Sequence, residues 1–172
     1  MADESGVKMK VLSTGIVNGY IDDKYGKRGL QKYKGVASLS IPIEICDAPE
    51  NTKCFALVLD DKDAVEVCGF TWIHWLVANL KTTALEENAS ETRSDIIQGV
   101  SSEHSAVSAL SVEDASRYAG MAPPDKPHRY DITVYALDSE LDLKNGFTYN
   151  KLWYAMKDHI IDTAVLTGIY NN

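Results

Sequence analysis

Three short stretches of the chain place acidic, imidazole and aromatic side chains beside apolar runs. They are Leu59-Asp60-Asp61-Lys62-Asp63-Ala64, Trp72-Ile73-His74-Trp75 and Pro123-Pro124-Asp125-Lys126-Pro127-His128-Arg129-Tyr130. Imidazole and phenol groups can donate hydrogen bonds to an oxyanion, and a protonated imidazole forms the stronger bond. A carboxylate nearby favours the protonated imidazole. The combination predicts a pocket for a small anion such as phosphate.

The residues that we expect to bind the anion are Asp61, His74, Ala122, Pro123, His128 and Tyr130. The two histidines and the tyrosine supply donors, while Asp61 orients and charges the imidazoles. Backbone amides around Ala122 complete the cradle, because the prolines that follow it lack an amide hydrogen. The chain has no His-Glu-x-x-His helix and no Cys-x-x-Cys pair, so we expect neither a metal ion nor a cofactor.

Three further residues could wall or support the pocket. Asp63 is more typical of a turn cap than of a ligand contact. Trp72 shares a face with His74 in an extended strand, where it either forms a wall of the pocket or packs in the core. Gly120 precedes the proline-rich loop. For His74 itself, a core histidine satisfied by a neighbour is the alternative reading.

Four runs rich in β-branched and aromatic residues predict the β core. They cover residues 36–45, 53–59, 70–80 and 130–137. Period-two alternation places His74 with Leu76 on one face of its run, and Ile73 with Trp75 on the other. Both faces are apolar, so we expect this strand to be central and covered on both sides. In the strand expected to begin near His128, the side chains on one face are those of His128, Tyr130, Ile132 and Val134.

One long helical pattern covers Thr148 to Leu166, with Thr148 as its N-cap. His159 lies on the apolar stripe of this pattern, which predicts a core or subunit contact. Gly168 is expected to end the helix, before a short strand at residues 169–170.

The remaining segments complete a single domain over residues 1–172. Residues 8–12 predict a short strand, and residues 15–35 a surface excursion. Residues 85–117 are rich in Ser, Ala and Glu, which predicts an insertion or lid that is only partly helical, with a short helix within 111–118.

Composition narrows the class of protein. The 172 residues carry a formal net charge of −8, which disfavours nucleic acid and anionic membranes as partners. No apolar run approaches the roughly 18 residues of a membrane span, and no signal-peptide pattern opens the chain, so we expect a cytoplasmic protein. The three cysteines are odd in number and widely spaced, which favours free thiols.

At the three stretches the chain resembles the phosphatidylethanolamine-binding protein family, and its bacterial and archaeal branch (YbhB/YbcL-like, Raf kinase inhibitor-like) more than the eukaryotic one. That family is marked by an Asp-Pro-Asp-Ala-Pro turn, an aromatic-x-His strand, and a Gly-Pro-x-Pro-Pro loop leading into His-Arg-Tyr. This chain has Asp61-Lys62-Asp63-Ala64-Val65, Trp72-Ile73-His74-Trp75, and Gly120-Met121-Ala122-Pro123-Pro124 with His128-Arg129-Tyr130. The resemblance implies a mainly β fold with α elements, similar to a β-sandwich with antiparallel and mixed sheets, and homodimers.

Three residues depart from the family pattern. Lys62, Val65 and Met121 stand where the family has proline. Proline restricts the backbone, so its loss predicts a looser first turn and a wider pocket or a different ligand.

The resemblance implies a non-enzymatic binding or regulatory protein that holds phosphate or a phospho-headgroup such as phosphoethanolamine. Members of the family have been linked to inhibition of kinases or proteases, so a protein partner of that kind is also implied. The alternative is a hydrolase or phosphate-processing enzyme that uses His74 or His128 as general acid or base. Against the alternative, the chain has no Gly-x-Ser-x-Gly elbow and no Walker-type loop.

Overall fold

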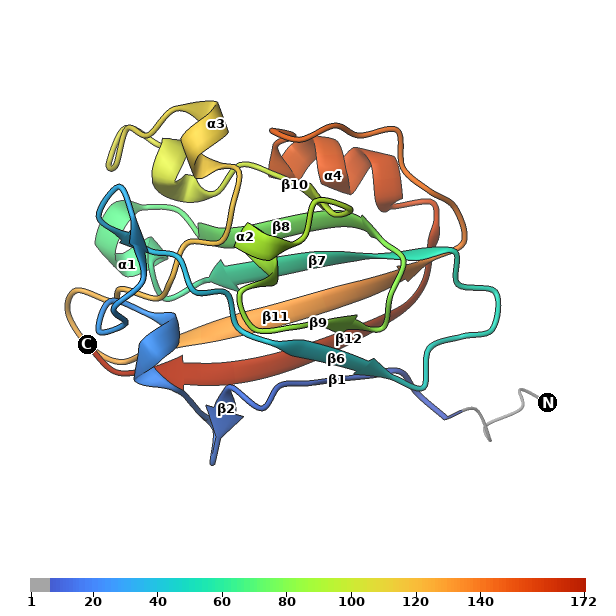
Figure 1. Cartoon of the computed structure of the whole chain (residues 1–172), viewed down its shortest axis with the longest axis horizontal. Coiled ribbons are helices and arrows are strands. Elements are labelled where there is room, and N and C mark those ends of the chain that lie inside the picture. Colours follow the sequence, from blue (N-terminus) through green and yellow to red (C-terminus); the bar gives the residue numbers. More distant parts are fainter. Residues whose placement is uncertain (1–6) are drawn as a thin grey trace.

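The computed structural model describes residues 7–172 and shows a mainly β protein with short helices (Figure 1). The strands are β1 (Lys10–Leu12), β2 (Ile16–Val17), β3 (Tyr20–Ile21), β4 (Lys32–Tyr33), β5 (Val36–Ala37), β6 (Ile43–Cys46), β7 (Cys54–Asp61), β8 (Trp72–Leu80), β9 (Ala84–Leu85), β10 (Ile97–Gln98), β11 (His128–Leu137) and β12 (Ile160–Tyr170). The helices are α1 (Val65–Cys68), α2 (Ala89–Thr92), α3 (Val112–Ala115) and α4 (Tyr149–Met156), with single turns η1 (Asp23–Tyr25) and η2 (Ser102–His104). No helix within residues 7–172 has the length and apolar character needed to cross a membrane.

Two sheets pack face to face. The large sheet has the strand order β10-β8-β7-β11-β12-β3-β2, and the small one has the order β1-β6-β9 (Figure 1). β12 pairs with β3 in parallel, whereas the other neighbours in these two sheets are antiparallel. Apolar side chains such as Val11, Ile45 and Leu85 of the small sheet share a core with Leu57 and Ile132 of the large one. The predicted mixed, sandwich-like β fold is therefore confirmed.

The helix α4 covers the opposite face of the large sheet. Its buried side chains Leu152 and Met156 pack in a second cluster with Ala56, Val58 and Leu76. Since Val58 and Leu76 are on β7 and β8, these strands are covered on both sides, as their apolar pattern predicts. The sheet is thereby a rigid support for the residues at its ends.

β8 contains a β-bulge at His74. Leu59 of β7 pairs with Trp75, whereas Asp60 pairs with Ile73, so His74 is the extra residue between two pairs. Trp75 consequently packs between the sheets, and Ile73 packs against the cluster under α4. The expectation that these two residues share a face is wrong, because simple alternation does not continue through a bulge.

The predicted long C-terminal helix is wrong beyond its first two turns. α4 ends at Met156. Gly168, expected to end the helix, instead lies inside the strand β12. Residues 160–167 are rich in β-branched side chains, and β12 pairs with β11 along its length. Pairing with a long neighbour thus outweighs the apolar residues that also fitted a helical period.

His159 lies in the turn between α4 and β12. Its Nδ1 atom is 2.9 Å from Oδ1 of Asp138, and its side chain is 43% exposed. The expected core contact is therefore wrong, because the predicted helical stripe ends before this residue.

Three other segments differ in part from expectation. Residues 36–45 form two strands in different sheets, because β5 pairs with β4 in a separate two-stranded sheet, whereas β6 belongs to the small sheet. Residues 15–35 are more than a surface excursion, since β3 joins the large sheet and Tyr25 is buried in the core. Residues 85–117 supply β10 at the edge of that sheet, and α3 lies within 111–118 as predicted.

Candidate functional site

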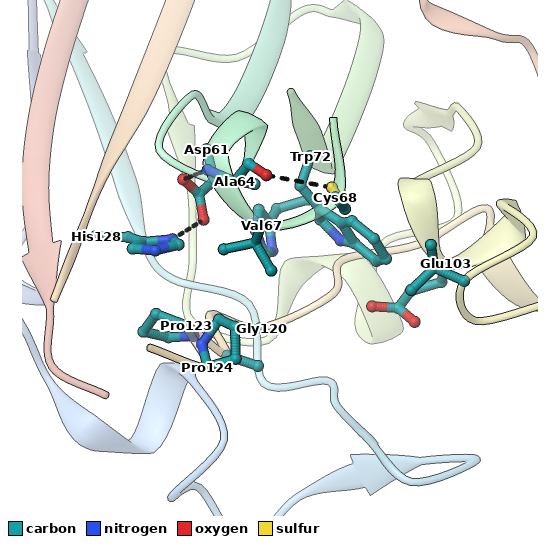
Figure 2. A pocket seen from close by; sticks show the side chains of 13 residues that line it. Asp61, Ala64, Val67, Cys68, Trp72, Glu103, Gly120, Pro123, Pro124 and His128 are labelled. Carbon is teal, nitrogen blue, oxygen red and sulfur yellow. Dashed lines mark hydrogen bonds and ion pairs between the residues drawn. The ribbon is translucent and has the colours of Figure 1, made fainter. Parts of the chain in front are cut away.

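A cavity of about 210 Å³ opens at the end of the large sheet where β7 ends and β8 and β11 begin (Figure 2). Its lining residues are Asp61, Ala64, Val67, Cys68, Trp72, His74, Glu103, Val107, Gly120, Ala122, Pro123, Pro124 and His128. The structure thus brings together most of the residues singled out in the three stretches. Two of them, Asp63 and Tyr130, do not line the cavity.

Asp61, the last residue of β7, is at the centre of the polar network. Its side chain is buried at 5% exposure, and both carboxylate oxygens are hydrogen-bonded. Oδ1 accepts from the Ala64 amide at 3.0 Å, and Oδ2 accepts from Nδ1 of His128 at 2.7 Å (Figure 2). Asp61 therefore closes the turn into α1 and orients the His128 imidazole.

His74 is buried at 4% exposure and lines the cavity from the bulge in β8. Its Nδ1 donates to the carbonyl oxygen of Ala119 at 2.7 Å. Burial lowers the pKa of His74 below its ordinary value, and the Ala119 hydrogen bond and the Asp61 charge offset this only in part. The expectation of a charged imidazole is wrong here, because desolvation exceeds the effect of the nearby carboxylate.

His128 opens β11 and is held by two carboxylates. Nδ1 bonds to Asp61 at 2.7 Å, and Nε2 bonds to Oδ1 of Asp125 at 2.9 Å. Burial disfavours the charged ring, but the hydrogen bonds and charges of Asp61 and Asp125 raise the pKa of His128 above its ordinary value. Both ring nitrogens face carboxylate oxygens, an arrangement that favours the protonated imidazole. His128 also has no donor left for a ligand in this arrangement.

Tyr130 lies beneath the cavity between the two imidazoles. Its ring centroid is 5.2 Å from that of His74 and 6.5 Å from that of His128. The hydroxyl is buried and has no hydrogen-bond partner of normal geometry among residues 7–172. Burial, followed by the Asp61 charge, raises the pKa of Tyr130, so the phenol stays protonated. Its position below the lining makes it a support of the histidines.

The first turn is ordered without the family prolines. Lys62 turns away from the cavity and pairs with Asp60 and Asp131, each at 2.8 Å. The Val65 amide donates to the Lys62 carbonyl oxygen at 3.2 Å, a bond that proline at this position could not make. Met121 is fully buried in the core. Hydrogen bonds therefore hold the turn where the family has restricted backbone angles.

The three supporting residues have distinct positions. The Asp63 carboxylate accepts from the Arg129 amide at 2.9 Å and so ties the turn to the start of β11. Trp72 is half-buried and forms a wall of the cavity (Figure 2). A Cβ atom on Gly120 would lie 2.6 Å from Cβ of Ala37, so the backbone approaches too closely there for any other residue.

Several cavity residues were missed by sequence reasoning. Val67 and Cys68 belong to α1, and Glu103 and Val107 come from the segment expected to be an insertion or lid. No motif in that Ser-rich segment pointed to Glu103. Asp125 was visible inside the third stretch, three residues before His128, but its contact with Nε2 depends on the fold of the loop. Among the described residues, no group of three His, Cys, Asp or Glu side chains could hold a metal ion.

Comparison with known proteins identifies the family. Residues 13–171 match the family model described as phosphatidylethanolamine-binding protein. The chain belongs to this family. The Bacillus subtilis protein YxkA is 45% identical over 150 residues, covering 84% of this chain and 89% of YxkA. The family and its bacterial and archaeal branch, predicted from the three stretches, are therefore confirmed.

Solved structures of phosphatidylethanolamine-binding protein relatives agree with the fold. A homologue from Chlamydia trachomatis is 32% identical, with a TM-score of 0.79 and coverage of 96% of this chain and 98% of that chain. YbcL of Escherichia coli is 24% identical, with a TM-score of 0.76 and coverage of 96% and 99%. The sheets and their connections are thus those of the family.

In this phosphatidylethanolamine-binding protein relative, we expect the two cavity histidines to titrate on opposite sides of an ordinary histidine. His128 should lose its proton above pH 6.5, and His74 should gain one only below that value, because their pKa values are raised and lowered from 6.5 respectively. Nuclear magnetic resonance of the ring nitrogens against pH measures both. The reverse order for His74 and His128 would contradict the arrangement described here.

Proposed function

We propose that the chain is a non-enzymatic binding protein whose cavity holds a small oxyanion that retains a proton, such as the phosphate monoanion or the phosphate group of phosphoethanolamine. The observation that carries the proposal is the orientation of His74, whose Nδ1 is engaged by Ala119. A neutral imidazole has one donor and one acceptor nitrogen. With the donor on the Ala119 carbonyl, Nε2 is an acceptor, and a ligand hydroxyl is the group that satisfies it.

The charges of the cavity favour the same ligand. Its lining, as far as the described part of the chain forms it, contains the carboxylates of Asp61 and Glu103 and no lysine or arginine. A fully ionised dianion offers only acceptors and would be repelled by these carboxylates. A singly charged oxyanion has a hydroxyl for Nε2 of His74 and oxygens for nearby donors. The Ala122 amide, which donates to no other described residue, is one such donor.

Glu103 suits the ammonium end of phosphoethanolamine. Its carboxylate lies across the cavity from Asp61 and His128 (Figure 2). One of its oxygens, Oε2, accepts from the Ser108 hydroxyl, which fixes the side chain. Phosphatidylethanolamine, for which the family model is named, pairs the same two charges, but its phosphodiester carries no proton near neutral pH, so the monoester phosphoethanolamine is the ligand of this proposal. Apolar residues such as Val67, Val107 and Trp72 form the rest of the wall, which fits a ligand with few polar groups.

A comparison of phosphate binding with sulfate binding distinguishes this proposal from nonspecific electrostatic attraction of anions. The two ions have similar shape, but sulfate carries no proton near neutral pH. We expect calorimetric titration at about pH 6 to show saturable binding of phosphate and phosphoethanolamine, and binding of sulfate at least about tenfold weaker, because one hydrogen bond to a buried acceptor is lost. Phosphate affinity should also fall as the pH rises past the second pKa of phosphate, near 6 to 7. Equal binding of sulfate and phosphate would contradict the proposal.

Nucleophilic chemistry has little support in the cavity. Among residues 7–172, Cys68 is the one lining residue with a thiol or hydroxyl. Its Sγ atom lies 3.3 Å from the Ala64 carbonyl oxygen and 3.4 Å from that of Phe70. The thiol thus points its hydrogen at backbone oxygens and not at a histidine base. The protein partner, the homodimer and the cytoplasmic location stay predictions.

A further inference from the structure

The loop before β11 places a carboxylate on the second nitrogen of His128. Asp125 lies in the segment Ala122-Pro123-Pro124-Asp125-Lys126-Pro127, and its Oδ1 is 2.9 Å from Nε2 of the imidazole. The histidine is 1% exposed, whereas the Asp125 side chain is 45% exposed. Asp125 is not among the residues that line the cavity, although His128 is. The carboxylate of Asp125, a residue at the protein surface, therefore already occupies the hydrogen-bonding position at Nε2 of the buried His128 ring.

Resting on the proposed function, we propose that Asp125 is a built-in competitor, and that the ligand's oxyanion binds His128 by displacing the Asp125 carboxylate from Nε2. The other ring nitrogen cannot serve the ligand, because Nδ1 is bonded to the buried Asp61 at 2.7 Å. Any direct bond between a ligand and His128 must therefore be made at Nε2. Asp125 and the ligand compete for one donor, and the strength of the internal contact sets the apparent affinity.

The loop is attached in a way that permits this exchange. The Pro123 carbonyl oxygen accepts from Nζ of Lys27 at 2.7 Å, which anchors the loop on the cavity side. Around Asp125 the contacts are at the surface: its carbonyl oxygen accepts from Asn172 at 3.1 Å, and Lys126 pairs with Glu66 at 2.5 Å. Exposed contacts of this kind contribute little and break readily. The Asp125 side chain can consequently leave while the anchored part of the loop keeps its position.

The charge balance supports the exchange as well. With the His128 imidazole protonated, the group Asp61, His128 and Asp125 has one positive and two negative charges, so its net charge is −1. Replacing the Asp125 carboxylate by a ligand oxygen returns Asp125 to water and keeps two anionic partners on the imidazolium. A ligand that bound without displacement would add a third negative charge beside the two carboxylates, at a cost in a site of low exposure.

Removal of the carboxylate tests the proposal. Inorganic phosphate is titrated by calorimetry into the native protein, Asp125→Asn and Asp125→Ala. The pH is about 6, below the ordinary pKa of histidine, so that protonation of the His128 imidazole is favoured. If the internal contact forms in nine molecules of ten, its loss tightens phosphate binding about tenfold, because the apparent affinity is reduced by the fraction of competent molecules. We expect the larger gain for Asp125→Ala, since asparagine retains a carbonyl oxygen that can accept from Nε2. Glu66→Gln removes a nearby exposed carboxylate that does not touch His128, and its affinity should stay within about twofold.

The possible outcomes separate this proposal from the proposed function. If the native protein binds phosphate and neither Asp125 variant binds it more tightly, Asp125 is not a competitor and the inference is overturned. If Glu66→Gln gains as much as the Asp125 variants, the effect is general electrostatics and the inference is again overturned. If neither the native protein nor any variant binds phosphate, the proposed function fails and the inference falls with it. Melting temperatures of all four proteins confirm that each is folded.

Discussion

Replacing Asp61 with alanine should lower the free energy of unfolding by about 3–5 kcal/mol, the range measured when one partner of a buried ion pair is removed. The carboxylate is nearly inaccessible and accepts from the Ala64 amide and from Nδ1 of His128. Its loss leaves a buried imidazolium with one partner and an amide with none. Urea denaturation, with the slope used to verify two-state behaviour, measures the change.

Asp63→Ala is the matched control for this prediction. It removes a carboxylate from the same turn, but Asp63 accepts a single bond, from the Arg129 amide at 2.9 Å, in an exposed position. We expect a loss of about 1 kcal/mol, as for one ordinary hydrogen bond. Similar losses for Asp61→Ala and Asp63→Ala would show that the turn matters and the buried network does not.

His74→Ala should weaken phosphate binding by at least about tenfold while the protein remains folded. The substitution removes the acceptor Nε2 that the ligand hydroxyl requires, and it leaves the Ala119 carbonyl oxygen without its donor. Loss of a hydrogen bond to a buried group weakens binding by roughly tenfold or more, equivalent to about 1.4 kcal/mol. Calorimetric titration at matched protein concentration measures the affinity, and circular dichroism verifies the fold.

Two variants make the His74 result specific. His74→Gln retains a polar side chain of similar length, and its amide oxygen could replace Nε2, so part of the affinity should return. His159→Ala removes an imidazole that pairs with Asp138 far along the chain from the cavity motifs, and phosphate affinity should be unchanged. If His74→Ala unfolds the protein while His74→Gln folds and binds no phosphate, the histidine is structural and the proposed pocket is wrong.

Local patterns were enough to predict the strands that carry the site. The apolar runs that became β7, β8 and β11 have no competing helical period. β7 ends at the first of the three motifs, and β8 and β11 begin at the second and third. Because Asp61 ends β7 and His128 opens its neighbour β11, antiparallel pairing brings the two residues to the same edge of the sheet. Their contact therefore follows from residue type and strand order.

The errors occurred where distant contacts decide the structure. Residues 160–166 fitted both a helical stripe and a strand, and the choice depended on pairing with β11. The bulge at His74 is visible only in the register between β7 and β8. The charge of His74 depended on how deeply the ring is buried, and the second partner of His128 depended on the path of the loop around Asp125. None of these is encoded in spacing along the chain.

The most direct test of the account follows the histidine ring nitrogens of the native protein by nuclear magnetic resonance during titration with phosphate at about pH 6. We expect saturable shifts at His74 and His128, with Nε2 of His74 changing in the direction of a stronger accepted hydrogen bond, and no change at His159. Absence of shifts at His74 and His128 with phosphate in the millimolar range, or equal shifts at all three histidines, would contradict a specific oxyanion pocket.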